Sequence, residues 1–550
     1  MDERWKKKTE RRERVDILVV DGYIDEPSLL GVPPYLSPEV RKLVGVARES
    51  DLTWEYITAD EYRRDGVPLA DIILVHGGVT VPGKYLGGTP LTVEEAEKIA
   101  EEPSETFLGG PLARYQDVEG FDHYSLKDLS AYFFDSLYGK GKDRWAEPEE
   151  IEDWLKYGHK VVERHPYYPD PLLLEMSAYR GCPRYFTGGC SFCSEPDYGK
   201  PQFRDQKDII EEFELLYEKG IRNFRIGGQS CTISYKAEGV GEKEIPVPQP
   251  EEVKRLFKGI NERCPQIEVL HVDNANPAVI AGYPVKSERT IQTLVEYTTS
   301  GNVLALGMET ADLDVIEKNN LNSKPDQVKN AVRLINKIGR ERGDNGMPKL
   351  LPGLNLLGGL KGETRETYEK NYQFLEEIVG EDLLLRRINI RQVLSHTDEF
   401  EVRYKNTFKR FKKKVRENID HQLLKKMLPE GTILKNVFME KQDGKTTFGR
   451  QIGTYPLLVG LEYPLDLGVY FDVCITDHGQ RSVTGIHQPF YLDKVSFRQL
   501  QKVPGIGKKR AATIFRERPK NKEELSEIIK NEKTLEIIFK FADFRCENDR

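Results

Sequence analysis

Residues 177–199 read SAYRGCPRYFTGGCSFCSEPDYG and hold three of the seven cysteines of the chain. Cys182, Cys190 and Cys193 fall within twelve positions around a glycine pair, and Phe192 directly precedes the last of them. Thiolates clustered at such spacing are typical metal ligands. Three of them leave a fourth coordination position open, so the sequence raises the question of which metal they hold and what fills that position.

Three interpretations of the cysteine loop are open at this point. A closed structural zinc site takes four ligands, and the nearest candidates for the fourth, His165 and Cys231, are both distant in sequence. If the three cysteines were unrelated buried thiols, their clustering in one loop would have no explanation. A four-iron cluster with three cysteine ligands fits the open count, because its fourth iron stays free to bind a substrate or cofactor. We expect an iron–sulfur cluster of the [4Fe-4S] type.

Apolar runs and helical stretches alternate regularly from just before this loop to residue 390. This alternation predicts parallel strands joined by helices, and six such units predict a partial (β/α) barrel. The chemistry of such barrels lies at the C-terminal rim, and the cysteine loop follows the first strand. The expected strands are residues 172–178, 223–228, 267–272, 302–307, 350–357 and 384–390, and the expected helices are residues 206–219, 250–263, 287–299, 326–339 and 364–379.

The N-terminal part has the same kind of pattern at a smaller scale. Short apolar runs at residues 15–20, 71–75 and 106–109 each end in glycine or a turn, and helical stretches at 37–50 and 92–102 lie between them. This order predicts a parallel, doubly wound sheet of the Rossmann-like type. Ligands of such a sheet bind beyond the C-terminal ends of its strands.

The pattern changes beyond residue 392. Residues 403–416, RYKNTFKRFKKKVR, carry eight Lys or Arg and no acid. Short alternating runs broken by Gly and Asp turns follow over residues 430–487 and predict a small antiparallel barrel. The last segment reads as a helix, a VPGIG turn and a second helix.

These patterns predict an α/β chain made of several domains, since 550 residues exceed what one hydrophobic core supports. The expected divisions are residues 1–115 for the Rossmann-like domain, 116–168 for a connector, 169–395 for the partial (β/α)6 barrel, 396–429 for a basic helical linker, 430–490 for a small β-barrel and 491–550 for a helix-hairpin-helix domain.

The composition limits the cellular compartment and the partners that we expect for the protein. The formal net charge of −8 hides local basic runs, so it does not identify a partner. No apolar stretch reaches the roughly 18–20 residues of a membrane span, and the charged N-terminus has no apolar signal-peptide core. Sparse cysteines with one ligand-spaced cluster favour a reducing compartment over a disulfide framework. We expect a cytoplasmic protein without a membrane partner, whose oligomeric state the sequence leaves open.

The motifs together resemble those of the radical S-adenosylmethionine (radical SAM) superfamily. The family motif is usually C-x3-C-x2-C with an aromatic residue before the third cysteine. Here CPRYFTGGCSFC is C-x7-C-x2-C, with Phe192 in the aromatic position. The resemblance implies that Cys182, Cys190 and Cys193 ligate a [4Fe-4S] cluster whose open iron binds S-adenosylmethionine. The longer first gap departs from the family pattern.

Further motifs fall where the family places its cofactor-binding segments. After the second expected strand, Gly227, Gly228 and Gln229 stand where the family has Gly-Gly-Glu, so Gln229 replaces the acid. Glu309 resembles the residue that meets the ribose hydroxyls. The pair Gly358 and Gly359 resembles the glycine motif near the adenine; it lies in the segment LLGGLKGETRETY.

Asn274 ends the third expected strand at the same rim. Contact with the cofactor or substrate and a turn that precedes Pro277 are both open interpretations of Asn274 and Asn276. The family resemblance implies reductive cleavage of S-adenosylmethionine to methionine and a 5′-deoxyadenosyl radical that abstracts hydrogen from the substrate. It also implies a one-electron donor such as ferredoxin or flavodoxin.

The N-terminal sheet resembles the cobalamin-binding domain that precedes many radical SAM enzymes. GVPPYLSPEVRKLVGVA is similar to the proline-containing loop and helix of that domain. The Asp-x-His-x-x-Gly ligand motif is absent, because Leu74 and Val75 precede His76. Cobalamin without a lower histidine ligand and a degenerate domain like that of methylthiotransferases are both open.

The C-terminal segment resembles the helix-hairpin-helix motif, in which glycines let backbone amides approach a phosphate. Gly505 and Gly507 take the glycine positions, and Lys508, Lys509 and Arg510 add positive charge. Residues 498–522 carry nine Lys or Arg against one acid. The small barrel before them resembles the RNA-binding barrel of methylthiotransferases.

The combination resembles an archaeal-type group of radical SAM proteins with a C-terminal helix-hairpin-helix. We expect an enzyme, a transferase that modifies a nucleic acid, with a tRNA base favoured, by methylation, methylthiolation or another C–H functionalisation. The first alternative is the same chemistry on a protein or small metabolite. The second is a non-catalytic iron–sulfur protein that binds nucleic acid.

Overall fold

The structure is a computed structural model that describes residues 14–25, 27, 30–79, 85–394 and 400–544. It contains two compact units, which we call the first and the second unit. The chain passes between them several times, and each is described by itself. The first unit comprises residues 1–180, 202–228 and 259–268, and the second comprises residues 181–201, 229–258 and 269–550.

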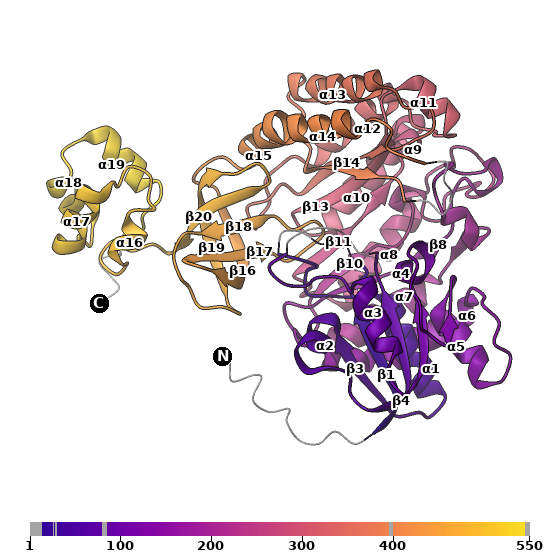
Figure 1. The fold of residues 1–550 in the computed structure, drawn as a ribbon. Helices are drawn as coiled ribbons and strands as arrows, with labels where there is room; N and C mark the ends of the chain where they lie inside the picture. The colour runs from indigo at the N-terminus through magenta and orange to yellow at the C-terminus, as the bar shows by residue number, and fades with distance from the viewer. Residues whose placement is uncertain (1–13, 26, 28–29, 80–84, 395–399, 545–550) are drawn as a thin grey trace. The chain divides into compact units, whose positions relative to one another are not determined.

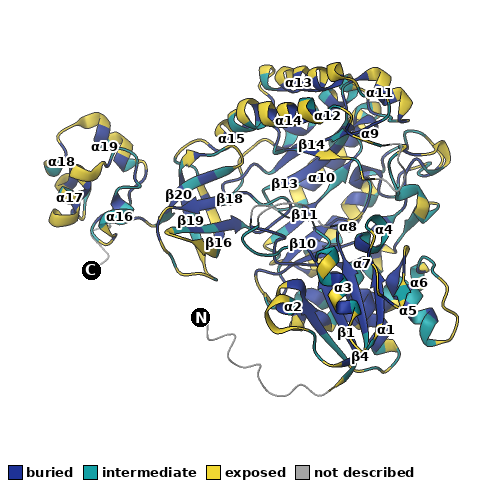
Figure 2. Cartoon of the chain, in the orientation of Figure 1, coloured by how far each residue is buried: buried dark blue, intermediate teal, exposed yellow. Residues whose placement is uncertain are grey.

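A five-stranded parallel sheet forms the N-terminal part of the first unit (Figure 1). Its central strands are almost wholly buried (Figure 2), because their apolar runs are covered on both faces. The doubly wound sheet is thus confirmed. In spatial order its strands are β3 (Trp54–Thr58), β1 (Val15–Gly22), β4 (Ala70–Gly77), β5 (Glu105–Gly109) and β6 (His123–Tyr124).

Strands β3 and β6 were not predicted, because neither has the sequence pattern of a buried strand. β3 reads WEYIT and begins with two half-buried residues, so it lacks a continuous apolar run. β6 has only two residues. The expected helices are present as α1 (Pro38–Glu49) and α3 (Val93–Ala100), each with a Ser or Thr side chain that caps its N-terminus.

The segment expected as a connector, residues 116–168, contains two helices that belong to the first unit: α5 (Leu129–Leu137) and α6 (Pro148–Gly158). Helix α6 crosses α1 at a pair of glycines. A Cβ atom on Gly45 would lie 2.0 Å from the carbonyl oxygen of Trp154, and one on Gly158 would lie 1.8 Å from that of Arg41. The two backbones therefore touch, which only glycine permits.

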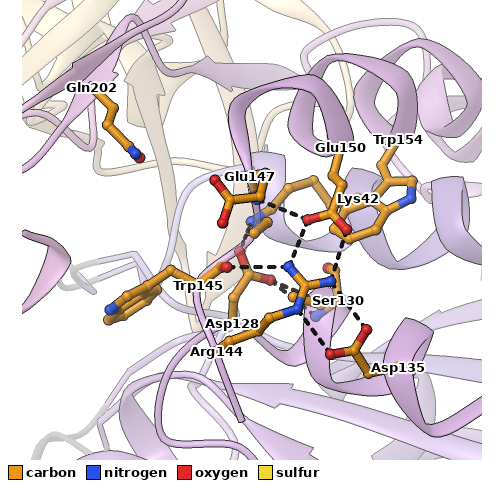
Figure 3. A network of polar contacts seen from close by, with 12 residues as sticks. Lys42, Asp128, Ser130, Asp135, Arg144, Trp145, Glu147, Glu150, Trp154 and Gln202 are labelled. Atoms are coloured by element: carbon orange, nitrogen blue, oxygen red, sulfur yellow. Dashed lines mark hydrogen bonds and ion pairs between the residues drawn. The ribbon is translucent and has the colours of Figure 1, made fainter. Parts of the chain in front are cut away.

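Ion pairs fix this segment (Figure 3). Arg144 contacts both Asp135 of α5, at 2.8 Å, and Glu150 of α6, at 2.7 Å. Lys42 of α1 forms a buried ion pair of 2.7 Å with Asp128, the N-cap residue of α5. Since both partners in that pair are buried, removing either one would leave an uncompensated charge.

The first two strands of the barrel also belong to the first unit. β7 (Leu173–Met176) runs parallel to β10 (Asn223–Ile226) and to the two-residue β2 (Tyr35–Leu36). The fully buried Arg41 reaches from α1 to the carboxylate of Glu212 on α7 (Gln206–Glu218) and to the carbonyl oxygen of Glu175. One guanidinium thus ties α1 to the start of the barrel.

The later part of the barrel lies in the second unit and has the expected α/β order. Strands β12 to β15 form one parallel sheet. The strands here are β11 (Val269–Val272), β12 (Asn274–Ala275), β13 (Asn302–Glu309), β14 (Leu350–Gly358) and β15 (Arg387–Gln392); the helices are α9 (Pro277–Gly282), α10 (Pro284–Tyr297), α11 (Leu313–Lys318), α12 (Pro325–Gly339) and α13 (Arg365–Gly380), and α8 (Pro250–Arg263) begins in this unit and ends in the first.

A closed five-stranded barrel follows, as the sequence predicts, but it is not wholly antiparallel, because the strands Leu458–Leu461 and Ser482–Gln488 pair in parallel. The basic run before it forms α14 (Lys405–Lys414), which continues through a π-helical turn (Val415–Asp420) into α15 (His421–Met427). The strands are β16 (Ile433–Asp443), β17 (Thr446–Gln451), β18 (Leu458–Leu461), β19 (Tyr470–His478) and β20 (Ser482–Gln488), and the terminal helices are α16 (Phe497–Leu500), α17 (Lys508–Glu517), α18 (Lys522–Ile528) and α19 (Glu532–Phe539).

The small barrel and the terminal helices share one hydrophobic core. Leu434 and Val473 of the barrel belong to the same buried cluster as Leu500, Ile514 and Ile538 of the helices. Among the helices that the described residues form, none is both long and apolar enough to cross a membrane.

Replacing Gly45 with alanine should lower the free energy of unfolding of the first unit by about 1–3 kcal/mol, because the added methyl group forces α1 and α6 apart. Unfolding followed by tryptophan fluorescence measures this directly, since Trp54, Trp145 and Trp154 all lie in the first unit. Gly380→Ala is the matched control: nothing lies within 4 Å of its added Cβ atom. Equal loss of stability in both variants would contradict the packing role of Gly45.

Candidate functional site

The cysteine loop belongs to the second unit and doubles back on itself at its glycine pair. Gly188 and Gly189 have φ values of +91° and +63°, which favour glycine. A Cβ atom on Gly189 would lie 2.8 Å from Cγ of Pro196 and 3.6 Å from Sγ of Cys182. The turn therefore returns the chain to the first cysteine in spite of the seven-residue gap.

The three thiols lie close enough to influence one another. Burial, with a smaller contribution from the neighbouring thiols, raises the pKa of Cys190 and of Cys193 to about 12. Burial also raises the pKa of Cys182. In the metal-free protein all three side chains are thus held as thiols, and a bound cation has to supply the charge that stabilises the thiolates.

Arg184, a residue of the long gap, is the main hydrogen-bond donor to these sulfur atoms. Its backbone N–H donates to Sγ of Cys182 at 3.3 Å, and its Nη1 donates to Sγ of Cys190 at 3.4 Å. The guanidinium also donates to the carbonyl oxygen of Asn320 at 2.9 Å and pairs with Glu244 at 2.7 Å. Sequence reasoning missed Arg184, because its role depends on residues far along the chain.

The donor set fits a cluster better than a single ion. Within the described part of the chain, no three His, Cys, Asp or Glu side chains are arranged around one metal ion. In a four-iron cluster each cysteine binds a different iron, so such convergence is not required. Cys231 accepts hydrogen bonds from Ser234 Oγ, at 3.1 Å, and from the backbone N–H of Asn276, at 3.2 Å, as a packed internal thiol does.

Glu309 lies at the C-terminal end of β13 in a strained conformation. Its φ is +61°, the register of β13 shifts between Gly307 and Glu309, and its Oε1 lies 2.9 Å from where a Cβ atom on Gly307 would be. Oε2 is buried and has no hydrogen-bond partner. Burial raises the pKa of Glu309 to about 8, and its charge in turn raises the pKa of Cys190. Strain and an unsatisfied buried acceptor make Glu309 a candidate for binding a ligand.

The glycine pair after β10 belongs to the first unit. The N–H of Gly227 donates to the carbonyl oxygen of Met176 at 3.0 Å, and Gly228 has a φ of +70°. A Cβ atom on Gly227 would lie 2.6 Å from Oε1 of Glu175. The carboxylate of Glu175, on β7, therefore lies beside this glycine turn, where the family motif has Glu and this chain has Gln229. The sequence alone does not identify Glu175, because it lies far from the glycine motif.

Gln229 and Asn274 lie in the second unit and contact each other. Nδ2 of Asn274 donates to the carbonyl oxygen of Gln229 at 3.2 Å, and Nε2 of Gln229 donates to Oγ1 of Thr232 at 3.5 Å. Asn276 is the N-cap of α9, and its side chain accepts from the N–H of Ala278 at 2.9 Å. The turn interpretation thus holds for Asn276, whereas Asn274 positions the backbone after the glycine pair.

Gly358 and Gly359 end β14 and are packed against their own chain. A Cβ atom on Gly358 would lie 2.7 Å from the ring of Phe408, and one on Gly359 would lie 3.4 Å from Val402. Packing against Phe408 of α14 and against Val402 is thus a sufficient reason for both glycines. Phe192 lies half-buried within the cysteine loop.

The glycine turn near the C-terminus joins α16 to α17. Gly505 has a φ of +85°, whereas Gly507 is the N-cap of α17, with an ordinary φ and no atom within 4 Å of an added Cβ. Lys508 and Lys509 are exposed at the start of α17, and Nη1 of Arg510 donates to the carbonyl oxygen of Gly505 at 2.8 Å. The turn thus gathers free backbone amides and positive charge at one helix end.

The glycines at the edge of the N-terminal sheet give little support for a cobalamin site. Cβ atoms on Gly78 and Gly110 would lie 2.5 Å from the carbonyl oxygen of Tyr23 and 2.7 Å from that of Gly77, so these glycines serve packing within the chain. His76 is buried behind them, and burial lowers its pKa to about 4.

Known proteins resemble the chain at several levels. A protein of Methanocaldococcus jannaschii described as uncharacterised is 43% identical over 505 residues, which cover 85% of this chain and 92% of that protein. The ribosomal protein uS12 methylthiotransferase of Thermotoga petrophila is 25% identical over 43% of this chain and 52% of its own length. A tRNA-2-methylthio-N(6)-dimethylallyladenosine synthase of Acinetobacter baylyi is 23% identical over 40% of this chain and 41% of its own length.

Among solved structures, the radical S-adenosylmethionine methyltransferase TsrM of Kitasatospora setae aligns with 68% of this chain and 72% of its own, at 14% identity and a TM-score of 0.44. The family model of the radical SAM superfamily matches residues 176–375, which include the cysteine loop and Glu309. The chain therefore belongs to the radical SAM superfamily.

Proposed function

We propose that the protein is a radical SAM transferase that modifies a nucleic acid, with a tRNA base as the favoured target. The observation that carries the radical chemistry is a loop that brings three thiols close enough to raise one another's pKa, with a strained glutamate near one of them. Cys182, Cys190 and Cys193 would hold a [4Fe-4S] cluster. When bound and reduced, this group supplies the electron that cleaves S-adenosylmethionine to methionine and a 5′-deoxyadenosyl radical.

The residues of the chain position and shield the reactants. Arg184 donates to two of the sulfur ligands, and such hydrogen bonds raise a cluster's reduction potential. Glu309 offers a buried acceptor for the ribose hydroxyls of the cofactor. In the first unit Glu175 stands beside Gly227, and its carboxylate pairs with Arg225 at 2.6 Å. A low-potential donor such as ferredoxin or flavodoxin would supply the electron in the cytoplasm.

Two features support a nucleic-acid substrate. Exposed Lys508 and Lys509 flank the open N-terminus of α17, where the helix dipole and free amides favour a phosphate, so this end would act as a helix-hairpin-helix. The small barrel packs against these helices, so both would contact one RNA. A relative named for the synthesis of a modified tRNA nucleoside is similar to this chain over 222 residues.

A protein substrate is the second candidate, because one group of relatives modifies a ribosomal protein. The two classes are separated by comparing the nucleosides of tRNA, and the masses of ribosomal proteins, from cells with and without the gene. A nucleoside that disappears with the gene supports the first candidate. An unchanged nucleoside profile with a changed ribosomal protein supports the second.

The cluster and the cofactor should depend on different residues. Replacing any one of Cys182, Cys190 and Cys193 with alanine should abolish cleavage of S-adenosylmethionine and lower the iron content from about four per chain after anaerobic reconstitution. Glu309→Ala should keep the iron but weaken S-adenosylmethionine binding by roughly 1–3 kcal/mol, the usual cost of a lost buried hydrogen bond. Native zinc in place of iron, or unchanged affinity in the Glu309 variant, would refute these assignments.

The stability of the metal-free protein should fall as pH rises, owing to Glu309. Its pKa is about 8 in the folded chain and 4.5 when unfolded, so between these values the folded state holds a proton that the unfolded state releases. Glu309→Gln cannot ionise and should therefore gain stability over the natural protein, by a few kcal/mol, between pH 5 and pH 8.

Amide hydrogen exchange in β13 measures this stability difference locally. Glu317→Gln, which removes the same charge from an exposed position of α11, is the control and should change little. A pH profile of Glu309→Gln that parallels that of the natural protein would show that the carboxyl is not held protonated.

The C-terminal turn should supply affinity for RNA without affecting cleavage of S-adenosylmethionine. Gly507→Glu adds a negative side chain at an open position, so it should weaken RNA binding and flatten its salt dependence while the fold is kept. Gly507→Ala is the matched control and should bind nearly as well. Binding isotherms at several salt concentrations measure the effect, and equal affinity in both variants would assign the turn to packing.

A further inference from the structure

The guanidinium of Arg184 is buried within the cysteine loop, and only 4% of the residue is exposed. Nη1 donates to Sγ of Cys190 at 3.4 Å, and the backbone N–H of the same residue donates to Sγ of Cys182 at 3.3 Å. The buried Nε has no hydrogen-bond partner. One charged group thus already contacts a sulfur atom, and it keeps a further N–H for a group that is bound at the cysteines.

Asn320, in the turn after α11, fixes the direction of this guanidinium. Its carbonyl oxygen accepts from Nη1 of Arg184 at 2.9 Å. Its side-chain Nδ2 donates to the carbonyl oxygens of Thr187, at 3.2 Å, and of Gly189, at 2.6 Å. The φ of Asn320 is +50°, a value that asparagine adopts more readily than most residues. The turn therefore holds both the guanidinium and the loop that carries Cys190.

The preceding residue, Asn319, is fully buried and joins the same loop to the barrel. Its carbonyl oxygen accepts from the N–H of Ser191 at 3.0 Å, and its Oδ1 accepts from Oγ of Ser191 at 3.0 Å. Oδ1 also accepts from the N–H of Lys361, which follows β14, at 3.1 Å, and Nδ2 donates to the carbonyl oxygen of Lys361 at 2.9 Å. Asn320 therefore extends from a turn that is itself anchored to the barrel.

Glu244 contacts the remaining terminal nitrogen of the guanidinium. Its Oε1 lies 2.7 Å from Nη2 of Arg184, and its side chain is 43% exposed, against 5% for that of Arg184. The segment before Glu244 is tied to the cysteine loop, because the N–H of Gly241 donates to the carbonyl oxygen of Pro183 at 2.7 Å and the N–H of Phe186 donates to that of Gly241 at 2.9 Å. The carboxylate thus offsets part of the positive charge that Arg184 brings to the sulfur atoms.

We propose that Asn320 and Glu244 set the reduction potential of the cluster through Arg184, as positioning residues with opposite effects. The inference rests on the proposed function, because it requires a four-iron cluster on the three cysteines. Reduction adds one electron from the donor protein to that cluster, so a hydrogen bond and a positive charge at its sulfur ligands favour the reduced form. Asn320 keeps the donor aimed at Cys190 and raises the potential. Glu244 offsets the charge and lowers it.

The test measures the midpoint potential of the reconstituted full-length protein by redox titration, followed by the electron paramagnetic resonance signal of the reduced cluster. Arg184→Gln removes the donor and the charge, so reduction should become about tenfold less favourable, or about 59 mV for one electron. Glu244→Gln should raise the potential, because the guanidinium then keeps its full charge. Glu288→Gln is the matched control and should leave the potential unchanged, since Glu288 of α10 pairs with Lys337 of α12 at 2.8 Å.

A double-mutant cycle tests whether Asn320 acts through Arg184. Asn320→Gly keeps the backbone carbonyl group and suits the positive φ, but it removes the two side-chain hydrogen bonds to the loop. It should lower the potential in the natural background and leave it unchanged in the Arg184→Gln background. Equal changes in both backgrounds would show that Asn320 only packs the loop and would overturn its positioning role.

Iron content separates this inference from the proposed function. A natural protein without a four-iron cluster would overturn both. A natural protein with about four irons per chain, and a potential that does not rise in Glu244→Gln, would overturn this inference alone. Because the side chain of Glu244 is partly exposed, Glu244→Gln keeps the test valid if Arg184→Gln fails to hold the cluster.

Discussion

Three thiols held close together resist ionisation, and the rest of the site is built around that constraint. Loss of solvent contact raises their pKa values most, and the neighbouring acidic groups and thiols add to this effect. A cationic cluster reverses this balance, with Arg184 as a fixed donor to two sulfur atoms. Burial of Glu309 also costs free energy, since its buried Oε2 has no hydrogen-bond partner. The site is therefore strained when empty, and its ligands relieve the strain.

Much of the fold follows from the sequence because parallel strands and their helices alternate with a clear apolar period. The expected strand at residues 350–357 is β14, and the expected helix at residues 326–339 is α12. β3 escaped prediction because its residues are only partly apolar. Residues 116–168 looked like a connector because their charges serve ion pairs within the unit, as those of Arg144 do.

The candidate site is less readable from sequence, since its partners meet only through the fold. The cysteine spacing predicts the three ligands, but it gives no sign of Arg184, whose guanidinium is positioned by Asn320 and Glu244 far along the chain. Glycines proved ambiguous for a related reason. Gly358 matches a cofactor motif, yet the ring of Phe408 fills the space in front of it. A glycine motif indicates a position where a larger side chain is excluded. Only the structure shows which atoms exclude it.

The hydrophobic core shared by the small barrel and the terminal helices makes them a single cooperative piece. Cutting the chain between β20 and α16 would separate Leu500 and Ile514 from the barrel residues of this cluster and would break the hydrogen bonds that join Gln488 to Phe541 and Phe490 to Asp543. Such a truncation would lose solubility as well as the basic turn. During synthesis the barrel therefore completes its core only after the last helices leave the ribosome, which makes folding of this region late and dependent on an intact C-terminus.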